Sequence, residues 1–577
     1  MELKSKWTDR SKGKQFRESK EAFNFILANR YEGVYESEEA VKEIQDQVSI
    51  IVNTIIDDIK EKRPILLWGD YDVDGTCSVL IWIFTLRAMG LKPFRDFDYY
   101  IPDRIDGYGL SIEGLEKEVK NFKTVITMDN GITAREASLW CQEKGVKLIV
   151  TDHHTYNDEN ITKAPYIFNP KQYEYNKYSH LCGSGISYLI CLKLFVTFHR
   201  DEIPEAYKQL RNDLAFFAAM GTVCDFVPLV SANRSIFSDA RESLKSNTPA
   251  LSHLSYVLRL GHNPLTSDDF GFTIGPLLNA CGRMADMTPV IRYFTASLKA
   301  TCFEQFQTMK DHLLHRKMNE AEMNRIINDE IKQRAEDADP LDGVKPYLFY
   351  GNSSFHLGIV GLTATKYTND MNIPCMFFVY GDVCKGSGRS IPGLDLLSIL
   401  KQKEHLFLTL GGHEMAFGFS FEKENYQEID DFIDGELFLA FEETPSKFEK
   451  QLQYDGELSP DCLNLDIAKR IDSIEPFGIS YPRPVFKVRA IVIKKEIIGK
   501  NKEHSQVFIR DNTGLPKKIM FFFMNPDVSP GEPLEVLVSI GLSMWKGKQN
   551  ILVKAVDSRS KNLGFAMYQK NKIVSND

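Results

Sequence analysis

Residues 69–75, GDYDVDG, place three carboxylates at alternate positions directly after the apolar run ILLW at 65–68. Asp70, Asp72 and Asp74 repel one another, so a fold that buries them together needs positive charge among them. Carboxylate oxygens in such a cluster are the usual ligands of hard divalent cations. The segment therefore predicts a cation site at the end of a buried strand, and any fold of this chain has to provide it.

A calcium-binding loop is the main alternative for the pattern D-x-D-x-D-G. A loop of that kind beginning at Asp70 requires a glutamate at its twelfth position, where this chain has Ile81. The residues before Asp70 also favour a strand rather than a helix. A catalytic metal site is therefore the better interpretation.

The composition is that of a globular protein with several cores. A chain of 577 residues is expected to form roughly three to four domains, and its 43% hydrophobic and 26% charged residues are ordinary values. No apolar run of membrane-spanning length and no signal-peptide core is found, which predicts a cytoplasmic protein without a membrane partner. The ten cysteines include no C-x-x-C pair, which disfavours zinc ribbons and disulfide frameworks. The net charge of −9 neither predicts nor excludes nucleic-acid binding, because clustered carboxylates raise the acidic count.

Short apolar runs that end in polar loops alternate with helix-like stretches from residue 64 onward. The runs at 65–68, 124–128 and 147–150 are followed by the polar segments 70–74, 129–131 and 151–154. Helices are expected over 77–89 and 134–144. The alternation predicts an α/β fold with a parallel sheet, whose functional sites lie at the carboxyl ends of the strands.

The later segments predict a second α/β lobe, joined to the first by a long helix, and then a β-barrel. The second lobe begins after Asp339-Pro340 and contains two predicted loops, 385–390 and 411–413. Five β-rich runs resemble an OB-fold, which is a small closed barrel; they are 485–493, 506–510, 518–523, 534–540 and 551–556. The predicted boundaries are an N-terminal helical segment 1–60, a first lobe 61–300, a connecting helix 301–338, a smaller lobe 339–447, the barrel 448–560 and a tail 561–577.

The polar strand ends carry ligands suited to magnesium or manganese. Carboxylates and one imidazole would meet if these ends converge: Asp72, Asp74, Asp129, His153 and Asp225. Two cations about 3.5–4 Å apart can contact both the attacking water and the leaving oxygen of a phosphate ester, and one carboxylate must then bridge them. Asp129 is the predicted bridge, because it follows a separate strand and Gly131 permits close approach of the backbone. A single aspartate before a glycine is as often a turn or a helix cap, but a series at successive strand ends favours the metal site.

His153 and His154 are adjacent and are expected to act differently. On a loop both rings can face the site, with His153 on a cation and His154 toward a substrate phosphate. Asp152 precedes the pair and is expected to orient one ring. The alternative is a structural role, which is the more frequent one for an isolated histidine.

These motifs resemble those of the DHH phosphoesterase superfamily, and most closely its RecJ branch of single-strand-specific DNA exonucleases. Segments 69–75, 129–131 and 152–154 look like the first three metal motifs. Further segments similar to RecJ are 100–104 with 107–109, 182–185, 221–225 and 278–284; 356–361, 386–390 and 411–413 resemble the DHHA1 domain, and 475–478 leads into a region resembling the RecJ OB domain. The resemblance covers roughly residues 60–560 and implies the order DHH, DHHA1 and OB for the two lobes and the barrel.

The resemblance also implies roles for single residues. Asp72 and Asp129 would hold a first cation, Mn²⁺ or Mg²⁺, and the second would be held by Asp74, Asp129, His153 and Asp225. Many superfamily phosphatases have a histidine four residues before the first aspartate of the D-x-D pair; here that residue is Trp68, so Asp70 is the expected substitute ligand. The implied catalytic residues are His154, Asp129 and Asp152. The implied substrate-binding residues are Arg104, Asn279, Arg283, Ser387, Arg389 and His413.

The barrel region combines lysines and arginines with the aromatic residues Phe508, Phe521 and Trp545. A basic groove with aromatic side chains is how OB-folds bind single strands without reading their sequence. The alternative is that these aromatic side chains fill the core of the barrel and that the lysines are merely solvated. No single barrel residue is therefore assigned to DNA.

The implied function is a single-stranded-DNA exonuclease that works 5′ to 3′ and releases 5′-mononucleotides with two Mn²⁺ or Mg²⁺ ions, in DNA repair and recombination. Single-strand-binding protein and a RecQ-type helicase are the partners that the resemblance implies. Two other functions stay open: a DHH hydrolase of oligoribonucleotides, cyclic dinucleotides or pyrophosphate, and a noncatalytic scaffold that binds nucleic acid. The residues after 448 weigh against the first, and the intact set of carboxylates and histidine weighs against the second.

Overall fold

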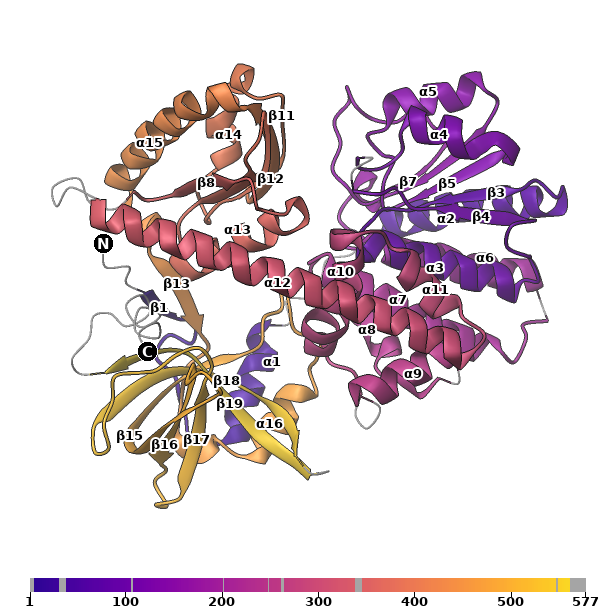
Figure 1. The fold of residues 1–577 in the computed structure, drawn as a ribbon. Coiled ribbons are helices and arrows are strands. Elements are labelled where there is room, and N and C mark those ends of the chain that lie inside the picture. The colour runs from indigo at the N-terminus through magenta and orange to yellow at the C-terminus, as the bar shows by residue number, and fades with distance from the viewer. Residues whose placement is uncertain are drawn as a thin grey trace. The chain divides into compact units, whose positions relative to one another are not determined.

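A computed structural model describes residues 5–30, 38–104, 107–200, 202–246, 248–260, 264–337, 345–545 and 548–560 of the chain (Figure 1). The tail predicted at 561–577 lies outside these residues. The chain divides into two compact units, which are described separately. The first unit comprises Glu32–Arg316 and Glu475–Pro482, and the second comprises Met1–Tyr31, Lys317–Ile474 and Arg483–Asp577.

The first unit is built around a five-stranded sheet in which every pairing is parallel. In sheet order, the strands are β4 (Phe97–Tyr100), β3 (Ile65–Trp68), β5 (Thr124–Met128), β6 (Lys147–Thr151) and β7 (Tyr166–Phe168). All residues of β3 and β5 are buried, as expected for strands that helices cover on both faces. The predicted parallel α/β fold is confirmed.

Helices cover both faces of this sheet (Figure 1). The helices of this unit are α2 (Glu38–Lys60), α3 (Val73–Ala88), α4 (Ile112–Glu118), α5 (Arg135–Glu143), α6 (Gly183–His199), α7 (Tyr207–Cys224), α8 (Ser231–Ala240), α9 (Pro249–Leu258), α10 (Gly275–Met284) and α11 (Thr288–Thr295), and α7 packs on α3 and α6 as part of a further layer. On one face, α3 and α6 pack against the sheet in a large apolar core that includes Leu67. On the other face, α4 and α5 enclose a smaller core that includes Leu66 and Trp68.

The helix predicted over 77–89 begins earlier than expected, at Val73. Asp72 is its N-cap and accepts a hydrogen bond from Gly75 N at 3.0 Å, which satisfies one of the free amide groups of the first turn. Asp74 lies inside this first turn. The segment GDYDVDG is therefore a strand-to-helix junction rather than a separate loop.

A single long helix, α12 (Lys299–Asp337), carries the chain from the first unit into the second. It corresponds to the connecting helix expected over 301–338. Within the described residues, no helix is long and apolar enough to cross a membrane.

The smaller lobe in the second unit contains a five-stranded mixed sheet. In sheet order, its strands are β11 (Thr409–His413), β12 (Ala416–Glu422), β10 (Val383–Arg389), β9 (Cys375–Val379) and β8 (Leu348–Asn352), and its helices are α13 (Leu357–Met371), α14 (Leu396–Lys401) and α15 (Tyr426–Glu443). The loops predicted at 385–390 and 411–413 are wrong, because both segments lie largely in strands. Glycine content suggested loops, but a Cβ on Gly388 would overlap the ring of Phe417, so the strand requires glycine there.

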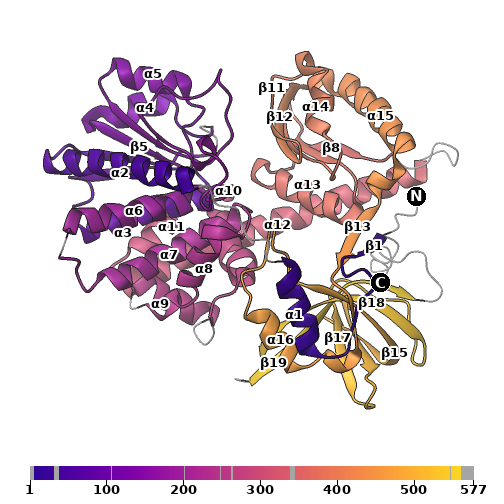
Figure 2. The same ribbon diagram turned by 180° about the vertical axis from the view of Figure 1, so that it is seen from behind.

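The barrel predicted after residue 448 is present in the second unit (Figure 2). Its strands are β15 (Val485–Ile498), β16 (His504–Arg510), β17 (Pro516–Phe521), β18 (Pro533–Trp545) and β19 (Lys548–Ser560). They pair in the order β16-β17-β19-β18-β15, and β15 also pairs with β16, which closes the barrel. Phe521 is fully buried, so it belongs to the core and not to a DNA-binding groove. The side chain of Trp545 lies outside the described side chains.

The prediction that residues 1–60 form a helical segment is wrong at its start. Strand β1 (Ser5–Asp9) pairs with β13 (Lys450–Tyr454), and β2 (Gln15–Phe16) pairs with β14 (Glu457–Leu458). The helix that follows, α1 (Ser19–Arg30), belongs to the second unit, where it contacts α16 (Leu465–Asp472) beside the barrel (Figure 2). These strands are short and polar and depend on partners distant in sequence, so no local periodicity predicts them.

Candidate metal centre and active site

The carboxyl ends of the strands in the first unit bring the predicted metal ligands together. Three groups of side chains have ligand atoms within 4.8 Å of one another: Asp70 with Asp72 and Asp129, Asp74 with His153 and Asp225, and Asp129 with His153 and His154. Asp129 and His153 each belong to two of these groups, so the groups form one continuous centre. Asp225 joins it from the end of α7 rather than from a strand.

Asp74 is held in place by the start of α6. Its carboxylate accepts hydrogen bonds from Gly183 N at 2.7 Å and Ser184 N at 3.0 Å, and Cys182 Sγ lies 3.0 Å away. Amide groups at a helix N-terminus favour negative charge, so they offset part of the repulsion from the other aspartates. A Cβ on Gly221 would overlap Asp74 Oδ1. The segments 182–185 and 221–225 therefore form the wall of the pocket that holds Asp74.

Asp129 has a left-handed backbone conformation, with φ of 65°. Aspartate tolerates this region better than most residues, but strain of this kind is common at functional sites. Its carbonyl oxygen accepts a hydrogen bond from Tyr108 Oη at 2.8 Å. A Cβ on Gly183 would overlap Asp129 Cβ, so α6 approaches the turn closely. The turn directs the carboxylate into the centre of the cluster.

The aspartates of the cluster oppose one another's ionisation. Burial raises the pKa of Asp70, Asp129 and Asp225 well above the ordinary value, and the charges of neighbouring aspartates raise it further. For Asp70 the main neighbour is Asp72, and for Asp129 and Asp225 it is Asp74. Added positive charge would stabilise the ionised cluster.

His153 can act as a ligand in this centre. Burial and then the charge of His154 lower the pKa of His153 to about 4, so its ring is neutral near pH 7. Its Nε2 lies 3.0 Å from Asp129 Oδ1 and 3.5 Å from Asp225 Oδ2. Within the described part of the chain, Asp70 Oδ1 is buried without a hydrogen-bond partner, and His153 Nε2 and Asp129 Oδ1 are buried with no partner in hydrogen-bond geometry other than their own 3.0 Å approach. Buried polar atoms without partners are rare, and this set of oxygen and imidazole atoms fits Mn²⁺ or Mg²⁺.

His154 and Asp152 form an ion pair beside the cluster. Asp152 Oδ1 lies 2.7 Å from His154 Nδ1, and the two backbone amides that follow Asp152 also donate to this oxygen. Burial lowers the pKa of His154, but the hydrogen bond and charge of Asp152 outweigh it and raise that pKa to about 9. The His154 ring is therefore protonated at neutral pH. Asp152 orients this ring and belongs to none of the ligand groups found among the described residues.

Trp68 is a core residue in this structure. Its side chain is fully buried on the face of the sheet that α4 and α5 cover, and its Nε1 donates to Gly109 O at 3.2 Å. Asp70, two residues later, lies within the ligand group of Asp72 and Asp129. Trp68, which stands where many superfamily phosphatases have a histidine, therefore supplies no ligand atom, and the Asp70 carboxylate lies in the ligand group instead.

Arginines border the loop that carries Asp70 and Asp72. Arg104 Nε donates to Gly282 O at 3.2 Å, and the guanidinium lies 4.2 Å from the centre of the Tyr71 ring. Burial raises the pKa of Tyr71, and the charges of Arg104 and Arg283 oppose this shift, so both arginines are near that ring. Asn279 lies one helical turn before Arg283 on α10. Arg104 and Arg283 therefore lie near Tyr71, beside the aspartates, and Asn279 shares a helix with Arg283.

The other predicted substrate-binding residues form a separate row in the second unit. Arg389 Nη1 donates to Ser387 Oγ at 2.7 Å, and Arg389 Nε donates to Thr365 Oγ1 on α13 at 3.0 Å. Arg389 pairs across the sheet with Ala416, which in turn pairs with the exposed residue His413. Residues in such a row share a face of the sheet. The row is one face of β10, β12 and β11.

Sequence reasoning missed the residues that position the ligands. Tyr108 Oη lies 3.1 Å from His154 Nδ1 as well as donating to Asp129 O, and Asn169 donates to His154 O at 2.9 Å. The motif at 107–109 was the only sign of Tyr108, and nothing in the local pattern pointed to Asn169. Tyr108 and Asn169 each contact a residue that follows a different strand, and only the folded sheet brings these segments together.

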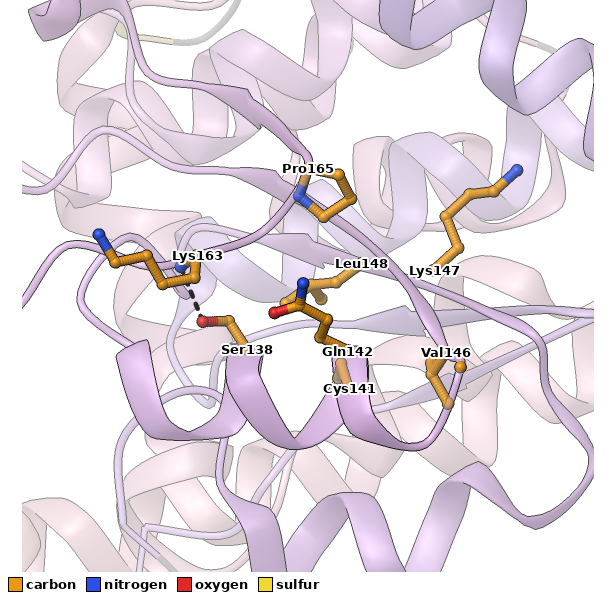
Figure 3. A pocket seen from close by; sticks show the side chains of 9 residues that line it. Ser138, Cys141, Gln142, Val146, Lys147, Leu148, Lys163 and Pro165 are labelled. Carbon is orange, nitrogen blue, oxygen red and sulfur yellow. Dashed lines mark hydrogen bonds between the residues drawn. The ribbon is translucent and has the colours of Figure 1, made fainter.

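A cavity of about 280 Å³ in the first unit lies apart from this centre. It is lined by Ser138, Cys141 and Gln142 of α5 and by Lys147 and Lys163, and Lys163 N donates to Ser138 Oγ at 2.7 Å (Figure 3). Lys147 begins β6, whereas the candidate ligands follow the carboxyl ends of the strands. The cavity is therefore not the candidate active site.

Comparison with known proteins agrees with this arrangement. Residues 64–222 match the DHH family, N-terminal domain, and residues 454–557 match the RecJ OB domain. The chain therefore contains a DHH-family N-terminal domain and a RecJ OB domain. Two RecJ relatives are named single-stranded-DNA-specific exonuclease RecJ. The one from Haemophilus influenzae is 28% identical over 80% of this chain and 81% of the relative, and the one from Escherichia coli is 29% identical over 82% of each.

Solved RecJ structures share the fold. The crystal structure of RecJ in complex with Mn²⁺ from Thermus thermophilus superposes with a TM-score of 0.75 at 19% identity, covering 97% of this chain and 80% of that one. The complex of that RecJ with Mg²⁺ gives a TM-score of 0.69 at 18% identity, covering 97% of this chain and 79% of that one. The predicted fold class, with its parallel sheet and OB barrel, is confirmed.

Proposed function

We propose that this chain is a metal-dependent exonuclease that hydrolyses phosphodiester bonds of single-stranded DNA. The observation that carries the proposal is the centre in which Asp70, Asp129 and His153 present buried ligand atoms with no hydrogen-bond partner outside the centre among the described residues. The names of the RecJ relatives supply the substrate and the reaction. The OB barrel is a fold that binds single strands.

Two divalent cations, Mn²⁺ or Mg²⁺, are proposed for this centre. Asp70 and Asp72 would hold one, Asp74, His153 and Asp225 would hold the other, and Asp129 would contact both. When bound, such cations activate a water molecule and offset the negative charge of the phosphate. Relatives crystallised with Mn²⁺ and Mg²⁺ support the choice of metals.

The chain's own side chains would hold and neutralise the substrate phosphate. His154 is protonated at neutral pH, because Asp152 raises its pKa to about 9, so it can donate a hydrogen bond to a non-bridging oxygen. Arg104 and Arg283 would bind phosphate oxygens on the side of Tyr71. Arg389, with Ser387 and His413 on the same sheet face, would bind a further phosphate group.

Direction, products and biological role follow from the family. We propose hydrolysis from 5′ to 3′ with release of 5′-mononucleotides, a role in DNA repair and recombination in the cytoplasm, and single-strand-binding protein and a RecQ-type helicase as partners. These proposals have no counterpart in the geometry of the site.

Hydrolysis of end-labelled strands tests the proposal. A single-stranded oligonucleotide is labelled at its 5′ end or its 3′ end and incubated with the full chain in Mn²⁺, Mg²⁺ or EDTA. We expect immediate release of 5′-labelled mononucleotide, a ladder from the 3′-labelled strand, and no product in EDTA. Binding without cleavage in any metal would favour the scaffold, and cleavage confined to very short oligomers would favour the small-substrate hydrolase.

A further inference from the structure

The turn after β7 brings a lysine to the edge of the metal centre. Asn169 follows this strand, is fully buried, and uses both ends of its amide group. Its Nδ2 donates to His154 O at 2.9 Å, and its Oδ1 accepts from Lys171 N at 3.0 Å. Asn169 therefore fixes the backbone of Lys171 relative to His154.

The charge of Lys171 acts on the groups of the site. Burial lowers the pKa of Lys171, and the charges of Asp152 and Asp225 oppose this shift, so these two carboxylates are the acidic neighbours of its ammonium. Among the described residues, no carboxylate forms a close ion pair with Lys171. Lys147 in the same sheet contrasts with it, because its Nζ lies 2.5 Å from the buried Asp58. Lys171 thus carries a positive charge near Asp152 and Asp225 without a close carboxylate partner among the described residues.

We infer that Lys171 is a further substrate-binding residue, whose ammonium group binds a phosphate of the single strand on the side of the centre formed by His154 and Asp225. The inference rests on the proposed function, because it assumes a nucleic-acid strand at this centre. Because no carboxylate forms a close ion pair with Lys171 among the described residues, its ammonium can pair with a phosphate whether or not cations are bound at the aspartates. Asn169 is a positioning residue in this arrangement, since it acts through Lys171 and His154.

Steady-state kinetics and metal-free binding of Lys171→Gln test this assignment. The control is Lys163→Gln, which removes another exposed lysine of the same unit whose backbone lines the separate cavity. For Lys171→Gln, KM for a single-stranded oligonucleotide should rise roughly tenfold with kcat nearly unchanged, as expected for the loss of one charged hydrogen bond. Lys171→Arg should restore most of the affinity, and Lys163→Gln should match the wild type. The affinity for Mn²⁺, measured by calorimetry without DNA, should not weaken in any of the three variants, because Lys171 is a cation and not a metal ligand.

Binding in EDTA separates this inference from the proposed function. Each phosphate contact to a single strand contributes about 0.7 to the slope of log K against log salt concentration. Lys171→Gln should reduce this slope by about one such contact, and this result does not depend on cleavage. An inactive wild type would overturn the proposed function while leaving this measurement decisive. An unchanged slope and an unchanged KM in Lys171→Gln would overturn the assignment of Lys171.

Asn169→Ala provides a second test with a different signature. Because Asn169 anchors both Lys171 and His154, its loss should raise KM as Lys171→Gln does and should also lower kcat. A second substitution of Lys171 should then add little to KM, since the two residues act together. Full additivity of the two effects on KM would overturn the positioning role.

Discussion

Two regions are proposed to bind phosphate, and they carry opposite charge: the metal centre of the first unit, and the row of Ser387, Arg389 and His413 in the second unit, called here the arginine row. In the first unit, buried aspartates repel one another and leave ligand atoms such as Asp70 Oδ1 without partners among the described residues. In the second unit, Arg389 is already positive and its hydrogen bonds to Ser387 and Thr365 orient it. The first region depends on added cations for its charge, and the second carries its own.

The largest effect should come from Asp129→Asn, which removes one charge from the middle of the metal centre. We expect turnover to fall by roughly a thousandfold or more, by analogy with the loss of an electrostatic group that acts on the transition state. In EDTA the variant should be at least as stable as the wild type, because the substitution relieves repulsion with Asp74 and Asp72. Rates on a labelled single strand and thermal unfolding measure the two effects. Retention of more than a few per cent of the activity would contradict the role of Asp129 as the shared ligand.

Arg389→Ala should give the opposite pattern, with a loss of substrate affinity and no loss of metal. Removal of one charged contact should raise KM roughly ten- to a hundredfold. Arg389→Lys should recover little, because the hydrogen bonds of Arg389 to Ser387 and Thr365 use its planar fork. Calorimetry with Mn²⁺ should be identical in wild type and variant. A weaker Mn²⁺ affinity in Arg389→Ala would remove the distinction between the two regions.

The stability of the metal-free protein should depend on pH through the metal centre of the first unit and not through the arginine row. The raised pKa values of Asp70, Asp129 and Asp225 mean that the folded state holds these protons more tightly than the unfolded state, so stability is lost as pH rises through the folded values. The pKa of His154, raised to about 9, has the same sign, and its contribution is lost as pH rises from about 6.5 through 9. We therefore expect the free energy of unfolding in EDTA to fall between about pH 6.5 and 9.

His153 does not disturb this pH window. Its pKa is lowered to about 4, so its contribution is fully present above about 6.5 and is lost only as pH falls below that value. Denaturant unfolding at a series of pH values measures the trend. Asp129→Asn should show a shallower decline than the wild type, and Arg389→Ala should show the same decline. Equal slopes in Asp129→Asn and wild type would mean that the cluster is not the source.

The sequence predicted the convergence of the aspartates better than the strands that carry the arginine row, and the reason is physical. An aspartate that directly follows an apolar strand such as β3 or β5 can be placed from the sequence. Parallel strands end at one edge of a sheet, so the aspartates that follow them lie at that edge. The glycines of β10 and β11 suggested loops, because a sequence does not show that Phe417 fills the space above Gly388. The early start of α3 was missed because the Asp72 cap decides where this helix begins. The strands β1 and β2 were missed because their partners are distant in sequence.

The smallest effect on activity is expected from Trp68→Phe. This substitution tests whether the last residue of β3 contributes to cation binding in the first unit. Trp68→Phe keeps an aromatic ring against Tyr100 but loses the hydrogen bond to Gly109 and part of the buried volume, so it should cost about 1–3 kcal/mol of stability. The Trp68 indole is buried in the core between the sheet and helices α4 and α5 and belongs to none of the ligand groups found among the described residues. The affinity for Mn²⁺ should therefore not change. Asp70→Asn is the matched variant, and it should weaken Mn²⁺ binding at least about tenfold. If Trp68→Phe weakened Mn²⁺ binding as much as Asp70→Asn does, position 68 would contribute to the centre and Asp70 would not be its substitute.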